Sequence, residues 1–148
     1  APGPPQPSMD LLRMRPIPDI SDVSSVFANS YPLCITRASG ALHCWPENEQ
    51  GRHFVLPPGP QADVSRVQGV DNVVQIGNGA VLRRDGAVFA LRRAEGSPHL
   101  QDLRNQAEIY ALQAVPIEGA SRDFVSVDSF CGLHRDGSAR CWVQRNVR

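Results

Sequence analysis

The sequence predicts a mainly all-β protein, an array of about three small antiparallel sheets with one short inserted helix. Thirteen prolines and twelve glycines interrupt the 148 residues too often for a helical bundle, and they are typical of short strands joined by turns. One hairpin-like pattern also occurs three times along the chain. The length of 148 residues fits a single domain.

The chain begins with a Pro-rich run, from Ala1 to Ser8, that can neither pair in a sheet nor fill a core. We therefore expect a flexible tail over residues 1–15 and a single β domain over residues 16–148. A start of this kind is what remains when an export signal is cleaved, although an arbitrary cut in a longer sequence would look the same.

The hairpin-like pattern divides the chain into units. Three segments align without gaps: residues 34–45, 80–91 and 131–142. The glycine at the centre of the pattern recurs after 46 and then 51 residues. This spacing predicts one small sheet for about every fifty residues. The expected units are residues 16–60, 61–113 and 114–148.

Each unit is expected to contain a hairpin closed by a three-residue turn. Asp-Gly between apolar strands is a strong hairpin signal, and residues 135–137 can form a type I turn closed by glycine in the left-handed region. This turn sets Cys131 opposite Cys141 in a pair without mutual hydrogen bonds, where side chains approach most closely.

The same register pairs Cys34 with Cys44, and in the middle unit it pairs Ala80 with Ala90. Because both partners change together, the pattern favours disulfides, and the expected bridges are Cys34–Cys44 and Cys131–Cys141. Nine residues separate the cysteines of each pair, whereas zinc ligands usually lie closer in sequence, so we expect no metal site. Disulfides point to an oxidising compartment, and we expect a secreted, periplasmic or cell-surface protein.

The two faces of the hairpins differ in polarity. The face that carries the cysteines is apolar, as with Leu133 and Ala139, while the opposite face mixes residues such as Ile35, His43 and Arg140. A sheet of this kind suits a blade packed between two neighbours. The pattern therefore predicts a β-propeller-like array.

The residues after the first hairpin resemble a known repeat. Residues 45–52, following a hairpin with a central glycine, are similar to the signature of the regulator of chromosome condensation repeat. Residues 131–142 resemble its secreted bacterial variety, which often carries a cysteine at each end of the hairpin. The resemblance extends from about Ile17 to Trp142. It implies a β-propeller that binds proteins through loops at the ends of the ring.

The chain also departs from that family. Pro46 stands where the family has glycine, and Leu91 replaces the tryptophan of the middle unit. About three units are present, which is fewer than a full ring needs. A partial ring leaves faces and strand edges unpaired. Three explanations are open: the chain is a piece of a longer protein, further copies of the chain or another protein complete the ring, or the fold has drifted from a propeller.

The segment from Ser97 to Leu112 predicts the inserted helix. Ser97 can cap it, a proline follows at the first helical position, and Leu100, Leu103 and Ala107 are spaced for one apolar face. We expect two or three turns, on a face where insertions in repeat proteins often bind partners.

The charge balance argues against some classes of function. Fifteen acidic residues offset fifteen basic ones, so we expect no nucleic-acid partner. The sequence contains no run of eighteen apolar residues, and we expect no membrane span. All fifteen basic residues are arginine. A GC-rich genome would explain the missing lysine, and so would selection against a modifiable amine in a toxin that enters host cytosol.

Basic side chains gather at the expected hairpin tips, and they are the candidate partner contacts: Arg37, Arg83, Arg84, His134 and Arg135. Planar guanidinium groups can hold carboxylates through two parallel hydrogen bonds. The sequence has no phosphate-binding glycine loop, nucleophile elbow or metal-binding histidine pair, so we expect no catalytic residue and no cofactor. The predicted function is an exported, disulfide-stapled module that binds another protein through repeat loops, as a subunit of a larger complex or as an enzyme inhibitor.

A secreted toxin subunit is the alternative function. Glu47 and Glu49 match the paired glutamates of ADP-ribosylating toxins, and Arg13 or Arg15 precedes them in the required order, with serines at positions 24 and 25 between. The distance from the serines to the glutamates is short for that fold, and both glutamates lie within the repeat signature. The enzyme is therefore the less favoured interpretation.

Overall fold

The structure is a computed structural model that describes residues 16–28, 32–45, 59–94, 100–102, 107–109 and 111–142. The predicted tail over residues 1–15 lies outside this part. The described chain is mainly β, as the sequence predicts. Its strands are β1 (Val23–Phe27), β2 (Leu33–Arg37), β3 (Ala41–Trp45), β4 (Arg66–Asp71), β5 (Val73–Gly77), β6 (Ala80–Arg83), β7 (Val88–Arg93), β8 (Leu100–Asp102), β9 (Ala107–Ile109), β10 (Leu112–Pro116), β11 (Phe124–Asp128), β12 (Cys131–His134) and β13 (Ala139–Cys141).

Nine of these strands form three antiparallel meanders of matching register: the first meander β1–β2–β3, the second β5–β6–β7 and the third β11–β12–β13. Each carries a register shift at the same place in its first strand. The hairpin pairs are those that the turn predicts: Cys34 with Cys44, Ala80 with Ala90, and Cys131 with Cys141. The turn chemistry therefore determines the register correctly.

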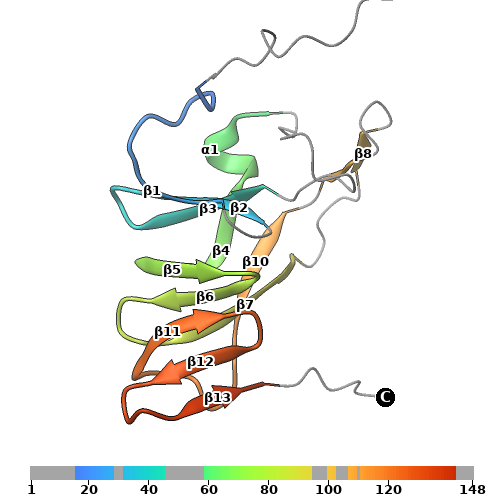
Figure 1. The fold of residues 1–148 in the computed structure, drawn as a ribbon. Coiled ribbons are helices and arrows are strands. Elements are labelled where there is room, and N and C mark those ends of the chain that lie inside the picture. Colours follow the sequence, from blue (N-terminus) through green and yellow to red (C-terminus); the bar gives the residue numbers. More distant parts are fainter. Residues whose placement is uncertain are drawn as a thin grey trace, which may run out of the picture.

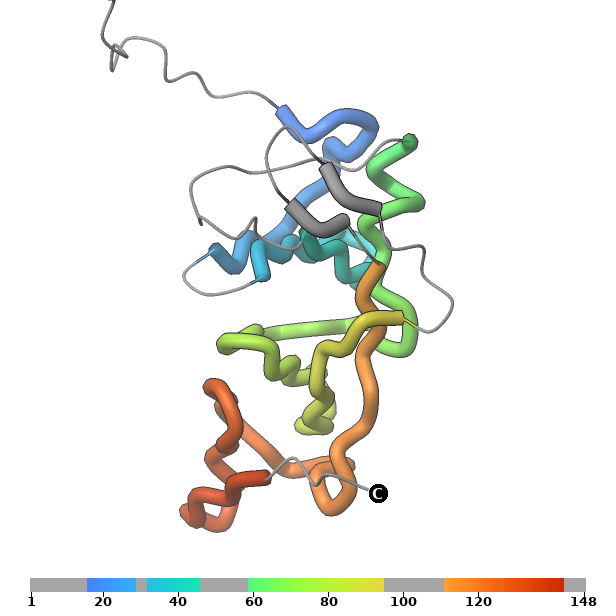
Figure 2. The backbone as a smooth tube through the Cα atoms, turned by 90° about the vertical axis from the view of Figure 1, so that its right-hand side faces the viewer, coloured from blue at the N-terminus to red at the C-terminus, as the bar shows by residue number. Residues whose placement is uncertain are grey.

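The meanders are less separate than the sequence predicts. β4 pairs with β3 and β10, and β10 pairs with β7, which joins the first two meanders into one eight-stranded sheet of order β1-β2-β3-β4-β10-β7-β6-β5. This sheet bends back on itself into a barrel-like shape. Figures 1 and 2 show the meanders stacked as layers, with β4 and β10 running along one side. The two connecting strands form this sheet because their backbone groups need hydrogen-bond partners.

Apolar side chains fill the spaces between the layers. Between the first and second meanders, the buried Leu42 belongs to the same core cluster as Val81 and Phe89. Between the second and third, Leu82 belongs to a cluster with Phe124. Adjacent residues of β6 thus face opposite neighbours, as the two-residue period of a strand requires. The second meander is buried on both faces.

The outer face of the first meander is covered by elements that are not strands. Ile35 and Trp45 are buried there with Ile20, and Ala62 from helix α1 (Gln61–Val64) packs against them. Trp45 Nε1 donates a hydrogen bond of 2.8 Å to Oε1 of Gln61. The first meander is therefore capped at the end of the stack (Figure 1).

The prediction of a helix between Ser97 and Leu112 is wrong. β8 and β9 lie in this segment and pair with each other, with Leu100 opposite Ile109, and Leu112 begins β10. Two or three helical turns are marginal in isolation, and three apolar residues at helical spacing do not distinguish a helix from a hairpin. The described helix, α1, lies in a segment for which we predicted none.

Both predicted disulfides are present. The Cα atoms of Cys34 and Cys44 are 4.1 Å apart, and those of Cys131 and Cys141 are 4.0 Å apart. The first bridge is buried beneath the second meander, whereas Cys141 of the second bridge is exposed. The two bridges are consistent with folding in an oxidising environment.

This difference in burial predicts the order of reduction. We expect a mild thiol reductant under native conditions to open Cys131–Cys141 well before Cys34–Cys44, because attack requires access to the sulfur. Alkylation at timed intervals, followed by peptide mass spectrometry, measures both rates in one sample. Equal rates would contradict the described burial.

The tip glycines offer a matched pair of substitutions. Gly86 and Gly137 both have φ of +89°, but a Cβ on Gly86 would lie 2.5 Å from the amide nitrogen of Asp123, whereas one on Gly137 meets nothing within 4 Å. Gly137→Ala should cost about 1 to 2 kcal/mol from backbone strain alone. Gly86→Ala should cost a further 1 to 3 kcal/mol, about that of overpacking. Urea unfolding of both variants tests this order, and equal losses would contradict it.

Candidate functional site

The three hairpin tips, where the sequence predicts the partner contacts, lie one above another on the same side of the stack (Figure 1). In each tip, a turn amide donates to a carbonyl just before the first strand of the same meander. These bonds run from Ala38 to Asp22, from Arg84 to Asn72 and from Arg135 to Asp123, at 2.9, 2.9 and 2.7 Å. One backbone hydrogen bond therefore ties each tip to the start of its own meander.

The first tip presents a paired arginine. Arg37 Nε donates to Oδ1 of Asp22 over 2.7 Å, and the arginine side chain is 28% exposed. This hydrogen bond is the main cause that lowers the pKa of Asp22 below its usual value. Arg37 is therefore occupied within its own meander.

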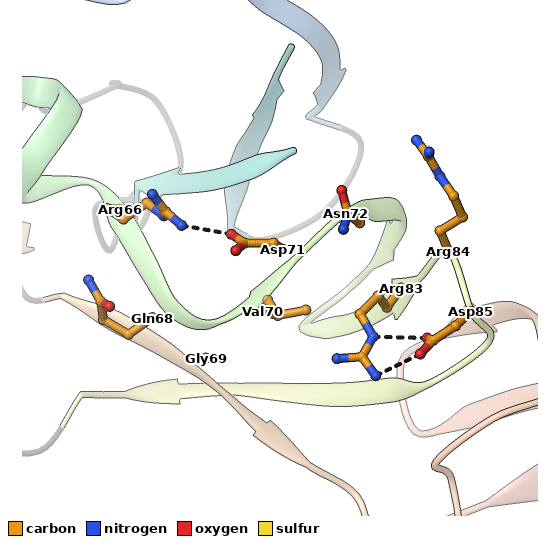
Figure 3. A pocket seen from close by; sticks show the side chains of 9 residues that line it. All are labelled: Arg66, Gln68, Gly69, Val70, Asp71, Asn72, Arg83, Arg84 and Asp85. Carbon is orange, nitrogen blue, oxygen red and sulfur yellow. Dashed lines mark hydrogen bonds and ion pairs between the residues drawn. The ribbon is translucent and has the colours of Figure 1, made fainter. Parts of the chain in front are cut away.

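The second tip borders an open groove of about 740 Å³, which we call the tip groove (Figure 3). Its lining comes from β4, the link to β5 and the end of the β6–β7 hairpin: Arg66, Gln68, Gly69, Val70, Asp71, Asn72, Arg83, Arg84 and Asp85. Two of the three arginines are already paired there. Arg83 holds Asp85 with bonds of 2.9 and 2.7 Å, and Arg66 Nη2 donates to Asp71 over 2.7 Å.

Arg83 is fixed further by the ring of Phe89. The guanidinium carbon lies 5.1 Å from the ring centroid, within the range of a cation–π contact. The hydrogen bond from Arg83 is the main cause that lowers the pKa of Asp85, followed by the one from the Ala87 amide. Arg83 and Asp85 thus form a fixed, mutually neutralising wall of the tip groove.

Arg84 differs from its neighbours. Its side chain is exposed and, within the described residues, forms no ion pair or hydrogen bond. In Figure 3 it extends away from the Arg83–Asp85 pair, on the side of Asn72. Its guanidinium is therefore available to a carboxylate from another molecule.

The third tip is organised around Asp136. Oδ1 of Asp136 accepts hydrogen bonds from the hydroxyl and the amide of Ser138, at 2.5 and 2.8 Å, and Oδ2 accepts one from Arg140 at 2.8 Å. The Ser138 hydroxyl is the largest cause that holds the pKa of Asp136 well below its usual range. His134 is half-buried against the edge of Phe124, and its Nδ1 accepts from the Asp136 amide over 3.2 Å.

The predicted contacts are thus brought together only in part. Arg83 and Arg84 line the tip groove, whereas Arg37, His134 and Arg135 do not. Arg135 is exposed, with its guanidinium 3.7 Å from Asp123. Nothing in the sequence pattern pointed to Arg66, Gln68 and Asn72. The first two lie in β4 and Asn72 links β4 to β5, so they border the second tip only through long-range backbone pairing.

A histidine of β3, His43, is fully buried. His43 Nδ1 lies 2.9 Å from the Ser65 hydroxyl, which itself donates to the Gln61 carbonyl. The hydroxyl proton is used in that second bond, so Nδ1 of His43 must carry a proton and donate to Ser65. Burial lowers the pKa of His43. The serine proton is held by a backbone carbonyl, which is not the arrangement of an activated nucleophile.

The structure says less about the metal, membrane and toxin expectations. No group of three or more metal-ligating side chains occurs among the described residues, and no helix in that part is long and apolar enough to cross a membrane. Arg13, Arg15, Glu47 and Glu49 lie outside the described residues. Ser24, one of the two serines in the toxin pattern, has its hydroxyl 3.0 Å from that of Thr36.

The carboxylate of Asp136 predicts a pH dependence of stability. Its folded-state pKa lies below that of the unfolded chain, so the interaction is fully present above about pH 4 and is lost as the pH falls toward the folded pKa. Asp136→Asn should therefore destabilise the protein near neutral pH, with a difference from the unmodified chain that shrinks in acid. Urea unfolding over this pH range measures the difference.

Ser138→Ala is the companion variant because it removes the largest cause of the shift. The pKa of Asp136, followed by NMR titration of its carboxyl carbon, should rise in this variant. An unchanged titration would contradict the described turn.

The chain matches no family model, no curated protein and no solved structure.

Proposed function

We propose that this chain is an exported, disulfide-stapled binding module that recognises an acidic segment of another protein at the tip groove. The observation that carries the proposal is the free guanidinium of Arg84 beside a groove whose other arginines are paired. A guanidinium can hold a carboxylate through two parallel bonds. The amides of Gln68 and Asn72, which also line the groove, can orient a bound backbone.

The scaffold supports this role because it holds the site rigidly. The Arg84 amide is bonded to Asn72, and the strands that flank its turn are buried in the second meander. A loop positioned by a packed scaffold is a common place for binding residues. The partner would be another protein or a further copy of the chain, bound as part of a complex or as an inhibited enzyme.

Two disulfides support a secreted, periplasmic or cell-surface location. The matching register and stacking of the three meanders support their interpretation as repeat units, similar to the regulator of chromosome condensation repeat. On this interpretation the array is a partial β-propeller, with an interaction role in place of a catalytic one.

The proposal is tested by binding measurements on an acidic peptide and on proteins captured from the producing organism's envelope or host. Arg84→Ala should weaken binding about tenfold or more, because a hydrogen bond to a charged group is worth about 1.5 to 3 kcal/mol. Arg92→Ala is the matched control: the charge change is the same, but Arg92 lies at the other end of β7. Equal losses in both variants would refute the site.

The alternative enzyme is separated in the same experiment. Glu47→Gln with Glu49→Gln should leave binding unchanged. Transfer of label from a nicotinamide dinucleotide to a protein, abolished by these two changes, would instead support the ADP-ribosylating toxin.

A further inference from the structure

The third meander leaves one of its faces open, and we call this the open face: Cys131, Leu133, Ala139 and Cys141. Leu133 is 44% exposed, Ala139 and Cys141 are exposed, and Cys131 is half-buried. In the other meanders the corresponding residues are buried. Strand register alone therefore does not explain this exposure.

The corresponding faces are covered in the same way each time. Cys34 and Leu42 of the first meander share a core cluster with Val81 of the second, and Leu82 of the second shares one with Val127 of the third. In both cases, the face that carries the cysteine positions packs on the non-cysteine face of the next meander. The third meander has the same face but no next meander among the described residues.

The tip glycines show the same difference in the backbone. The amide of Asn72 donates to the Gly40 carbonyl over 2.9 Å, and that of Phe124 donates to Gly86 over 3.1 Å. A Cβ on either glycine would lie 2.5 Å from an atom of the residue just before the following meander. Gly137 has φ of +89° like Gly86, yet nothing lies within 4 Å of the corresponding Cβ position. The third tip therefore has the conformation of the other two and lacks the neighbour that they contact.

The opposite end of the stack is closed. Ile35 and Trp45 are buried beneath Ile20 and α1, and both carboxylate oxygens of Asp19 accept hydrogen bonds from α1 amides at 2.9 and 2.8 Å. A second copy of the chain therefore cannot offer the outer face of its first meander. The non-cysteine faces of its second and third meanders already pack against its own layers.

We propose that the open face is the docking site for a further β-meander from outside these 148 residues, which packs its non-cysteine face on Leu133 and the Cys131–Cys141 bridge. The interface continues the two that already exist within the stack. The start of the docked meander would donate a backbone N–H to the Gly137 carbonyl, as Asn72 and Phe124 donate to the carbonyls of the first two tip glycines. This surface goes beyond the function proposed for the tip groove, and either proposal can fail alone.

The first interface, rather than the second, is the template for the docked meander. Asp128 occupies the register position of Gly77, where a Cβ would lie 2.7 Å from the Val127 carbonyl of the following meander. The third meander therefore cannot be approached as closely as the second is. The first meander has Phe27 at this position and a disulfide on the same face, and it is covered by the second.

The test supplies such a meander directly. A copy of residues 66–94, which contains β4 and the second meander, is joined after Arg148. The amides of the added strands should become protected from hydrogen exchange. Reduction of Cys131–Cys141 should slow about tenfold or more, because the bridge would then react only after local opening.

Variants identify the surface. Leu133→Asp should abolish both effects, and Ala139→Glu should do the same if one variant folds poorly. Val74→Asp in the original second meander is the control, since its side chain is also 44% exposed but lies off the open face. Arg84→Ala should change neither effect.

Two results would overturn the proposal. One is an added meander that stays unprotected while the rest of the chain is folded. The other is a dimer of the unextended chain, seen by native mass spectrometry, that Leu133→Asp dissociates, because the open face would then be an interface between identical copies.

Discussion

Burial of at least one apolar face of each hairpin against a neighbouring layer is the constraint on which the rest of this structure depends. An isolated hairpin is at best marginally stable in water, and a sheet with an apolar face buries that face against another element. The second meander meets the requirement with Val81 on one side and Leu82 on the other. The first meets it with a helix and an N-terminal segment, and the third meets it on one side only.

The connections between layers follow from the same constraint. A carbonyl at each of the first two tips accepts the amide that begins the next meander, so the turn closes one hairpin and also sets the position of the following one. This explains why the tips lie in a column and why the link before β5 reaches the second tip. The tip groove and its free arginine are thus a consequence of the stacking.

The sequence predicted local geometry well and long-range pairing poorly. The Cys34–Cys44 and Cys131–Cys141 pairs followed from a three-residue turn, whose chemistry lies within a few residues. The pairing of β10 with β7 could not be predicted, since nothing in the spacing of Leu112 specifies a partner about twenty residues away. The groove residues Arg66 and Asn72 were missed for the same reason.

Each of the first two tips holds the start of the next layer through a backbone hydrogen bond. Amide hydrogen exchange, followed by NMR on the isotope-labelled chain, tests it most directly at Asn72 and Phe124, the donors to Gly40 and Gly86. The account predicts protection at both amides comparable with that of the buried strand amides of β6. Exchange at the rate of open loop amides would contradict it.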